Sequence, residues 1–284
     1  MSILRLATFA TTFLSALAAQ RQADADLFTR LHRQAADAPL VVGHRGASAE
    51  CPENTVASFR RAVAAGAHMV EFDVYQSKDG KWVCMHDATC DRTTDAVARL
   101  GRKNVRVDAL DLGELRSLDA GGWRDARFVG ERVPTLEEAL AAIFPAVPMI
   151  ERKGGDAAAL VDELRRLRVV DRVLVQAFDW DWLEQVHRAE PALLLGALAG
   201  KQPTAELLAD LPRTGARLVH WDHRSLDLQT ALAIRAKGQL LCVYTVDPDI
   251  ALLGAARLGC DLVTTNVPAR MAALRDAGQL RRDR

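Results

Sequence analysis

Acidic side chains follow two short apolar runs in this sequence. Glu71 and Asp73 stand two residues apart, so on a strand both would face the same side. Two such carboxylates repel each other unless a cation neutralises them, and Glu151, after another apolar run, would add a third. Oxygen ligands without cysteine or clustered histidine favour Mg²⁺ or Ca²⁺ over zinc. The alternative is that one carboxylate faces solvent or pairs with a nearby arginine.

Two histidines and two basic residues also stand at the end of an apolar run or just after one. His44 and His86 could form a general acid and base pair, in which each partner would contribute roughly 10²–10⁴-fold. Taken singly, each could equally be a hydrogen-bonded structural histidine. Arg45 and Lys153 add fixed positive charge, and both residue types bind phosphate. Together with a cation, this set would suit the chemistry of phosphate esters.

Eight short apolar runs rich in Val and Leu must position these groups, and most are followed by a segment with helical periodicity. Such alternation predicts a parallel sheet with right-handed crossovers, and eight repeats predict closure into a (β/α)₈ barrel, a TIM barrel. The functional groups would then meet at the carboxyl ends of the strands. The runs are 40–45, 69–74, 147–151, 173–178, 193–198, 218–221, 240–246 and 262–265.

Two segments interrupt the alternation. Asp79–Gly80 between apolar runs predicts a hairpin in which the second barrel strand turns back and brings His86 opposite Asp73. Residues 88–134 are too long for an ordinary loop and predict a small subdomain inserted after that strand, above the barrel. The predicted domain therefore covers residues 39–279, with an insertion at about 88–134.

Residues 1–38 form a separate N-terminal segment. One early arginine, an apolar stretch over 6–17 and Ala16–Leu17–Ala18 resemble a secretory signal, which favours export to a periplasmic or extracellular location. The alternative is an amphipathic helix or a disordered tail on a cytoplasmic protein. A short helix is expected over 24–37.

The composition excludes several classes of protein. The chain has 284 residues, 49% of them hydrophobic, and its 37 basic and 37 acidic residues balance, so nothing suggests nucleic-acid binding. No segment of the body approaches the roughly 18 apolar residues of a membrane span. The five cysteines form no CxxC pair, which argues against a disulfide framework and a zinc site. Neither a nucleic acid nor a membrane span is therefore expected from the composition.

Over residues 40–275 the sequence resembles the glycerophosphodiester phosphodiesterases. The ordered motifs that carry the resemblance are His44–Arg45–Gly46, Pro52–Glu53–Asn54–Thr55, Glu71–Phe72–Asp73–Val74, Lys78–Asp79–Gly80, His86–Asp87, Arg92–Thr93–Thr94, Leu118–Asp119–Ala120–Gly121, Pro134–Thr135–Leu136–Glu137–Glu138, Ile150–Glu151–Arg152–Lys153, Gln176–Ala177–Phe178–Asp179 and Tyr244–Thr245–Val246–Asp247.

The resemblance implies a TIM barrel that hydrolyses glycerophosphodiesters to glycerol 3-phosphate and an alcohol. It implies a divalent cation on Glu71, Asp73 and Glu151, acid/base catalysis by His44 and His86, and phosphate binding by Arg45 and Lys153. Glu53, Asn54, Gln176 and Tyr244 lie in matching motifs and are expected to support the site.

Four positions depart from the family pattern. Tyr244 stands where the family usually has Trp, Asp247 where it has Asn, Ala177 where it has Ser, and Asn266 where it has Asp. None of these removes an expected catalytic group, so the departures bear on the preference for the head-group alcohol.

Two rival functions remain open at this stage. A related phospholipase D-type enzyme for lysophospholipids or sphingomyelin would need apolar surface near the mouth, for which Trp123, Phe128, Trp180 and Trp182 are candidates. A non-catalytic phosphate-binding barrel would be expected to lack a histidine or a carboxylate, and this chain has the full set.

Overall fold

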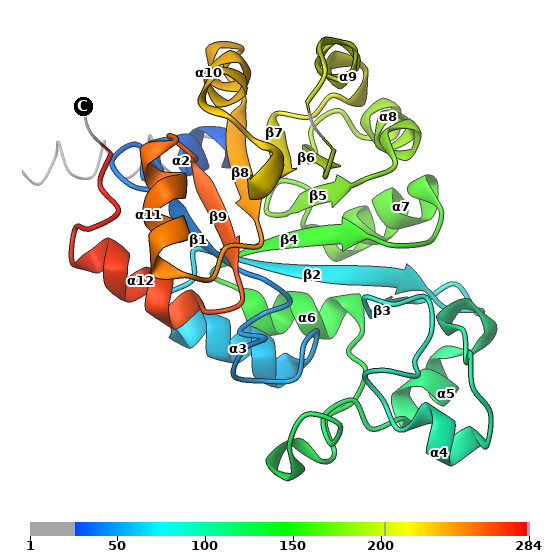
Figure 1. Ribbon diagram of the computed structural model, residues 1–284. Coiled ribbons are helices and arrows are strands. Elements are labelled where there is room, and N and C mark those ends of the chain that lie inside the picture. The colour runs from blue at the N-terminus through cyan, green and yellow to red at the C-terminus, as the bar shows by residue number, and fades with distance from the viewer. Residues whose placement is uncertain (1–25, 202, 283–284) are drawn as a thin grey trace, which may run out of the picture.

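Eight parallel strands close into a barrel in the computed structural model, which describes residues 26–201 and 203–282 (Figure 1). β1 pairs with β2 on one side and with β9 on the other, which closes the ring. The (β/α)₈ prediction is confirmed. The barrel strands are β1 (Leu40–Gly43), β2 (Met69–Gln76), β4 (Val147–Arg152), β5 (Leu174–Ala177), β6 (Leu194–Ala199), β7 (Leu218–Asp222), β8 (Leu240–Tyr244) and β9 (Leu262–Thr265).

Helices connect the strands and cover the outside of the barrel (Figure 1). Many begin at an Asp or Thr whose side chain accepts a hydrogen bond from a first-turn N–H, as Thr55, Asp156 and Asp179 do. The helices around the barrel are α3 (Val56–Ala64), α6 (Leu136–Ile143), α7 (Ala157–Leu167), α8 (Trp180–Ala189), α9 (Ala205–Asp210), α10 (Leu228–Ala236), α11 (Asp249–Arg257) and α12 (Pro268–Asp276).

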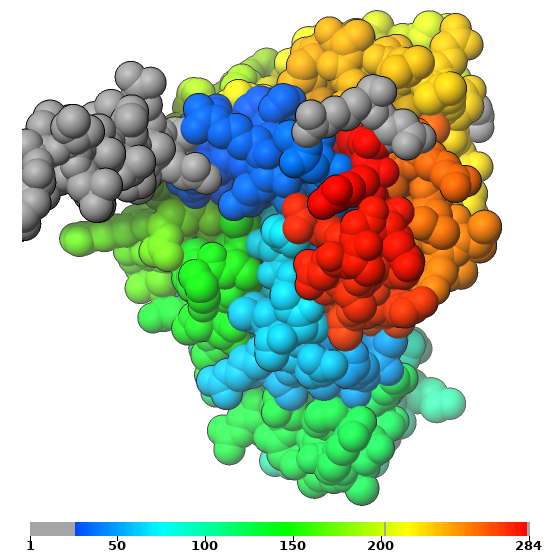
Figure 2. Space-filling view, turned by 90° about the vertical axis from the view of Figure 1, so that its left-hand side faces the viewer, coloured from blue at the N-terminus to red at the C-terminus, as the bar shows by residue number. Residues whose placement is uncertain are grey.

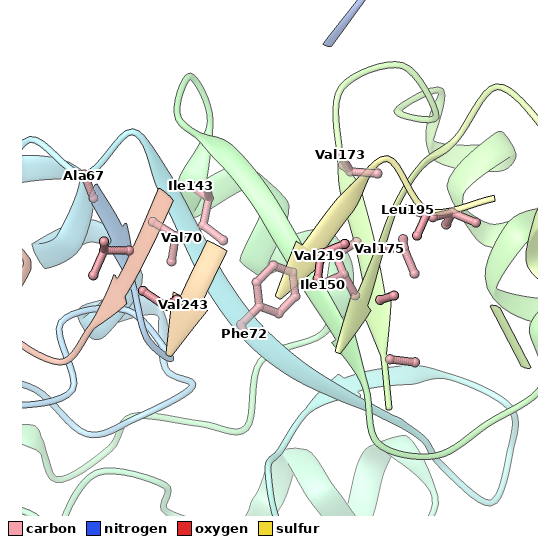
Figure 3. Packing of buried hydrophobic residues seen from close by; sticks show 14 of the residues in the cluster. Ala67, Val70, Phe72, Ile143, Ile150, Val173, Val175, Leu195, Val219 and Val243 are labelled. Carbon is pink, nitrogen blue, oxygen red and sulfur yellow. The ribbon is translucent and has the colours of Figure 1, made fainter. Parts of the chain in front are cut away.

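Successive side chains of β2 point alternately into the apolar layer under the helices and into the barrel. Val70 and Phe72 point outward into the apolar layer beneath the helices, which Figure 3 shows together with Ile150 of β4. Glu71 and Asp73 face the other way, because successive side chains of a strand point to opposite faces. Both carboxylates are buried at 1% exposure. Every second residue of β2 is therefore available for chemistry while its neighbours hold the barrel together.

The barrel interior at the amino ends of the strands is apolar and is closed by the first helix of the described residues. Leu27 and Leu31 of α2 (Leu27–Gln34) pack against inward residues of several strands, including Met69 and Met149. The C-terminal segment lies beside α2, where the Arg275 guanidinium donates to the carbonyl of Gln34 (Figure 2). This apolar plug leaves only the opposite, carboxyl end of the barrel for a polar site.

The hairpin after β2 forms, but its predicted register is wrong by one residue. β3 (Trp82–Cys84) runs antiparallel to β2, and the Met85 N–H donates to the Asp73 carbonyl, so Met85 rather than His86 lies opposite Asp73. The cause is a three-residue loop instead of a two-residue turn. The Ser77 N–H donates to the Lys81 carbonyl, and Gly80 takes φ 77°.

The segment between β3 and α6 has an apolar cluster of its own. It contains α4 (Ala96–Leu100), α5 (Leu112–Ser117) and the short 3₁₀ turns Val107–Ala109 and Ala126–Phe128. Leu115 and Leu118 are buried there, together with Val83 and Met85 from the hairpin. The segment projects from one side of the barrel (Figure 1) and is continuous with the loop that carries His86.

The predicted signal segment lies outside the described residues. Of the described helices, none is long and apolar enough to cross a membrane. The five cysteines are buried free thiols.

Candidate active site

A cavity of about 420 Å³ opens at the carboxyl end of the barrel strands. Seven of the residues singled out from the sequence line it, namely His44, Arg45, Glu71, His86, Glu151, Lys153 and Tyr244. The others, Glu53, Asn54, Asp73 and Gln176, lie just behind the wall and contact lining residues. The predicted strand ends thus meet at one mouth.

The three carboxylates of the predicted cation site come together. Glu71, Asp73 and Glu151 each offer an oxygen within 4.8 Å of the others, and all three are buried. The register of the sheet explains this, because Asp73 of β2 lies beside Glu151 of β4. Such a set of oxygen donors fits a hard divalent cation.

The electrostatics of these carboxylates also fit a cation. Burial and the charges of Asp73 and Glu151 raise the pKa of Glu71 well above its usual value. Burial, followed by the charge of Asp73, raises the pKa of Glu151 to about 7. Glu71 Oε1 is buried and finds no hydrogen-bond partner within the described part of the chain. A bound cation would satisfy this oxygen and relieve the repulsion.

Two basic side chains lie against the carboxylates. Lys153 Nζ is 3.3 Å from Asp73 Oδ1 and also pairs with Glu151, while Arg45 Nε is 3.4 Å from Asp73 Oδ2. Burial opposes the charge on Lys153, but the charges of Asp73 and Glu151 outweigh it and raise its pKa. Both side chains therefore remain cationic at the cavity wall, where they can bind a phosphate.

The loop after β1 holds Arg45 in an unusual conformation. Arg45 takes φ 52°, and its backbone N–H donates to Glu71 Oε2 over 2.9 Å. Gly46 follows at φ 88°, and a Cβ there would lie 2.6 Å from the Ser58 backbone, so only glycine fits. This strained turn aims a backbone donor at one carboxylate of the cluster.

Two supporting residues fix the cluster from behind. Asn54 Nδ2 donates to Asp73 Oδ2 over 2.9 Å, and Asn54 Oδ1 accepts from the Asp73 backbone N–H over 3.1 Å. Glu53 Oε1 accepts from Arg45 Nη1 over 2.8 Å. Burial opposes its charge, but Arg92 and Arg45 lower the pKa of Glu53 to about 2.

His44 is held by an amide. Asn266 Nδ2 donates to Asp247 Oδ2 over 2.7 Å, so Asn266 Oδ1 faces His44 Nδ1, also at 2.7 Å. Because this oxygen can only accept, Nδ1 carries the proton and Nε2 is the free acceptor. Burial and the charge of Arg45 lower the pKa of His44 to about 4. His44 is therefore neutral at pH 7 and has the protonation state of a general base.

His86 is held by a carboxylate. Its Nδ1 lies 2.6 Å from Asp87 Oδ1, an arrangement that leaves Nε2 free. Arg92 in turn binds both Asp87 oxygens, at 2.7 and 3.0 Å, and both Glu53 oxygens, at 2.9 and 2.8 Å. This arginine thus ties the loop of His86 to the loop of Arg45.

The last two supporting residues belong to a network on the far side of the barrel. Gln176 is fully buried, and its Oε1 lies 2.8 Å from His220 Nδ1. His220 Nε2 lies 3.0 Å from Thr264 Oγ1. The Tyr244 ring packs edge-on against the His220 ring, with centroids 5.0 Å apart. Gln176 therefore supports the cavity wall from behind, and Tyr244 forms part of it.

Reasoning from the sequence gave no role to Asn266, Asp247, Arg92 or His220. Asn266 and Asp247 follow strands and His220 lies within β7, so their positions alone place them near the mouth without giving them a partner. Their pairing partners depend on tertiary contacts over as many as 222 residues, as for His44 and Asn266.

The sequence model of the glycerophosphoryl diester phosphodiesterase family matches residues 44–270. The chain belongs to this family. A curated relative, the glycerophosphodiester phosphodiesterase of Bacillus subtilis, is 31% identical over 256 residues, which cover 82% of this chain and 85% of the relative. A glycerophosphodiester phosphodiesterase of Caldanaerobacter subterraneus is 36% identical over 167 residues, covering 56% of this chain and 66% of the relative.

Solved structures of the family have the same fold. A phosphodiesterase of Oleispira antarctica, in complex with the product sn-glycerol-3-phosphate, superposes with a TM-score of 0.76 at 28% identity. The match covers 84% of this chain and 97% of that one. A glycerophosphodiester phosphodiesterase of Agrobacterium tumefaciens gives a TM-score of 0.71 at 28% identity, covering 83% and 99%.

Proposed function

We propose that this member of the family hydrolyses glycerophosphodiesters to glycerol 3-phosphate and an alcohol. The observation that carries the proposal is the cavity itself, in which a buried cluster of three carboxylates is joined by two histidines and two basic side chains. The relatives named for this activity and the Oleispira structure with glycerol 3-phosphate support it.

Glu71, Asp73 and Glu151 would hold the divalent cation, for which we propose Mg²⁺ or Ca²⁺ because the donors are all oxygens. When bound, the cation would supply Lewis-acid stabilisation of charge on the phosphate oxygens. Arg45 and Lys153 would bind the same group, since both remain positively charged beside the cluster.

The two histidines would divide the proton transfers between them. His44, neutral and with Nε2 free, would accept a proton from the attacking oxygen, which is either water or the neighbouring glycerol hydroxyl. Attack by the hydroxyl would give a cyclic glycerol phosphate, which water would then open to glycerol 3-phosphate. His86, oriented by Asp87, would donate a proton to the leaving alkoxide. Asp87 would hold the ring so that Nε2 faces the cavity as the donor.

Two of the four aromatic residues considered for a lipid tail are not available at the surface. Trp180 and Trp182 are buried, and their indole N–H groups donate to the carbonyls of Leu198 and Gly155. Trp123 and Phe128 belong to the insertion and do not line the cavity. None of the four aromatic residues therefore offers a lipid tail an apolar surface on the cavity wall.

The proposal is tested by incubating the purified protein with glycerophosphocholine or lysophosphatidylcholine in the presence of Mg²⁺ or Ca²⁺. Release of glycerol 3-phosphate and choline from the first substrate is expected. Turnover of lysophosphatidylcholine alone, or release of phosphocholine, would contradict the proposal.

We also propose export of the protein, on the signal-like pattern of residues 1–18. Sequencing the N-terminus of the mature protein tests this, and an intact Met1 on cytoplasmic protein would contradict it.

A further inference from the structure

A second hollow of about 320 Å³ adjoins the catalytic cavity. Its walls come from the β5–α8 connection, the end of β6, the following loop and α9. β5 and β6 are neighbouring strands of the barrel (Figure 1). Phe178 and Leu198 belong to the walls of both spaces. A substituent on a phosphodiester bound in the cavity can therefore extend into this hollow, which we call the side groove.

The side groove is apolar where it meets the cavity. Phe178 is 51% exposed, although it is a large hydrophobic residue at the mouth of a polar site. Leu198, Ala199 and the half-buried Leu207 continue the apolar surface along the groove. Exposed apolar surface that is continuous with a ligand cavity marks a place for an apolar group.

The wall of the groove is already fixed by the protein. Four consecutive carbonyls at the end of β6 and the start of the following loop, those of residues 198–201, each accept a hydrogen bond from a side chain of another element. A wall held in this way needs little ordering when a ligand binds. The donors, in carbonyl order, are Trp180 Nε1, Tyr244 Oη, Ser225 Oγ and Trp221 Nε1.

The far end of the groove is charged. Arg213 forms ion pairs with Asp210 at 2.8 Å, Asp181 at 2.6 Å and Glu184 at 3.0 Å. Asp210 and Arg213 belong to the groove wall. A hydrocarbon chain that extended past this point would have to lie against paired charges, so the groove suits a short apolar group and not a long acyl chain.

We propose that the side groove is a subsite for a short apolar substituent on the alcohol half of the substrate. The inference rests on the proposed function and names a substrate class, glycerophosphodiesters whose alcohol carries a short alkyl or aryl group. The glycerol half is the poorer occupant, because its two hydroxyls would lose hydrogen bonds to water against Phe178 and Leu207.

A homologous series of substrates tests the subsite. The kcat/KM for release of glycerol 3-phosphate is measured with glycerophosphoethanol, glycerophosphobutanol and glycerophosphohexanol at saturating cation. We expect a rise of about two- to fourfold for each methylene that enters the groove, levelling off when the chain reaches Arg213.

Two variants at Leu207 test whether the side groove causes the rise of kcat/KM with alkyl length. Leu207→Asp places a charge in the groove but outside the catalytic cavity. This variant is expected to abolish the rise of kcat/KM with alkyl length, whereas Leu207→Ala should make that rise smaller. Leu228→Asp, at a position 56% exposed on α10 outside the groove, is the matched control and should keep the wild-type gradient. The wild-type series remains decisive if Leu207→Asp fails to fold.

The outcomes separate the inference from the function on which it rests. A flat series with good turnover of glycerophosphoethanol would overturn the subsite and leave the proposed function standing. An absence of glycerol 3-phosphate from every substrate would overturn both. Faster turnover of lysophosphatidylcholine than of glycerophosphohexanol would assign the groove to a chain on the glycerol half and contradict the proposal.

Discussion

Exchanging the partners Asp247 and Asn266 should move the pH dependence of catalysis. In the wild type, His44 Nδ1 faces the neutral amide of Asn266. The carboxylate of Asp247 is the next group in this chain of hydrogen bonds, on the other side of that amide. The double variant Asp247→Asn/Asn266→Asp keeps the net charge. The amide introduced at position 247 can donate to the carboxylate introduced at position 266. Its oxygen can accept the backbone N–H of residue 266 and the Thr265 hydroxyl, which both bind Asp247 in the wild type.

The size of the effect follows from the distance. A carboxylate in place of an amide oxygen 2.7 Å from the imidazole favours the charged ring and should raise the pKa of His44 by about 1–3 units. That corresponds to about 1.4–4 kcal/mol. Starting from about 4, the pKa would reach roughly 5–7. A general base must be neutral to act, so the acid limb of kcat/KM should move to higher pH by the same amount.

The assay is kcat/KM for glycerol 3-phosphate release between pH 4 and 9 at saturating cation. The exchanged variant should lose activity at pH 5 and keep most of it at pH 8. Asp249→Asn, which removes a surface partner of Arg270, is the charge control and should leave the limb in place. An unmoved acid limb in the exchanged variant would refute the role of His44 as base.

Three further predictions concern other parts of the site. His86→Ala should lower kcat by at least about 10²-fold with cation binding retained, as measured by calorimetry, and near-normal turnover would contradict the acid role. Arg92→Ala should lower kcat by roughly 10- to 100-fold with little change in KM, because His86 loses its outer support, whereas Arg106→Ala, which removes an exposed ion pair of the same insertion, should not. Equal losses in both arginine variants would count against the positioning role. The pKa of Glu151 is raised from 4.5 to about 7 in the folded protein. In EDTA, ionisation of Glu151 should therefore lower the free energy of unfolding as the pH rises through this range. Wild-type Tm should therefore fall more than that of Glu151→Gln between pH 5 and pH 8, and a larger fall in the variant would contradict the sign.

The barrel could be predicted because its signals are local. Each strand is a short apolar run, and the spacing of Glu71 and Asp73 by itself placed both carboxylates on one face. The position of Glu151 beside them followed from the parallel order of the strands. These inferences need only periodicity and the rule that barrel sites lie at carboxyl strand ends.

The hairpin could be predicted only in part from the local sequence. Asp79–Gly80 predicted the turn correctly in place but not in length, and its contacts reach beyond the hairpin, since Asp79 accepts the N–H of Leu112 in the insertion. The three-residue loop then shifted the register by one, so Met85 and not His86 lies opposite Asp73.

The partners of the site that are distant in the chain were beyond the reach of the sequence. Asn266 lies 222 residues from His44, and the bonds from Arg92 to Glu53 span 39 residues. Side-chain pairs of this kind depend on how separate loops approach each other at the rim. They orient the side chains of the site, which periodicity does not report.

The dependence of turnover on a divalent cation tests the central claim most directly. We predict that EDTA abolishes release of glycerol 3-phosphate from glycerophosphocholine, that Mg²⁺ or Ca²⁺ restores it, and that Glu71→Gln raises the cation concentration needed for half-maximal activity. Full activity in EDTA, or an unchanged cation requirement in Glu71→Gln, would contradict a catalytic cation on these carboxylates.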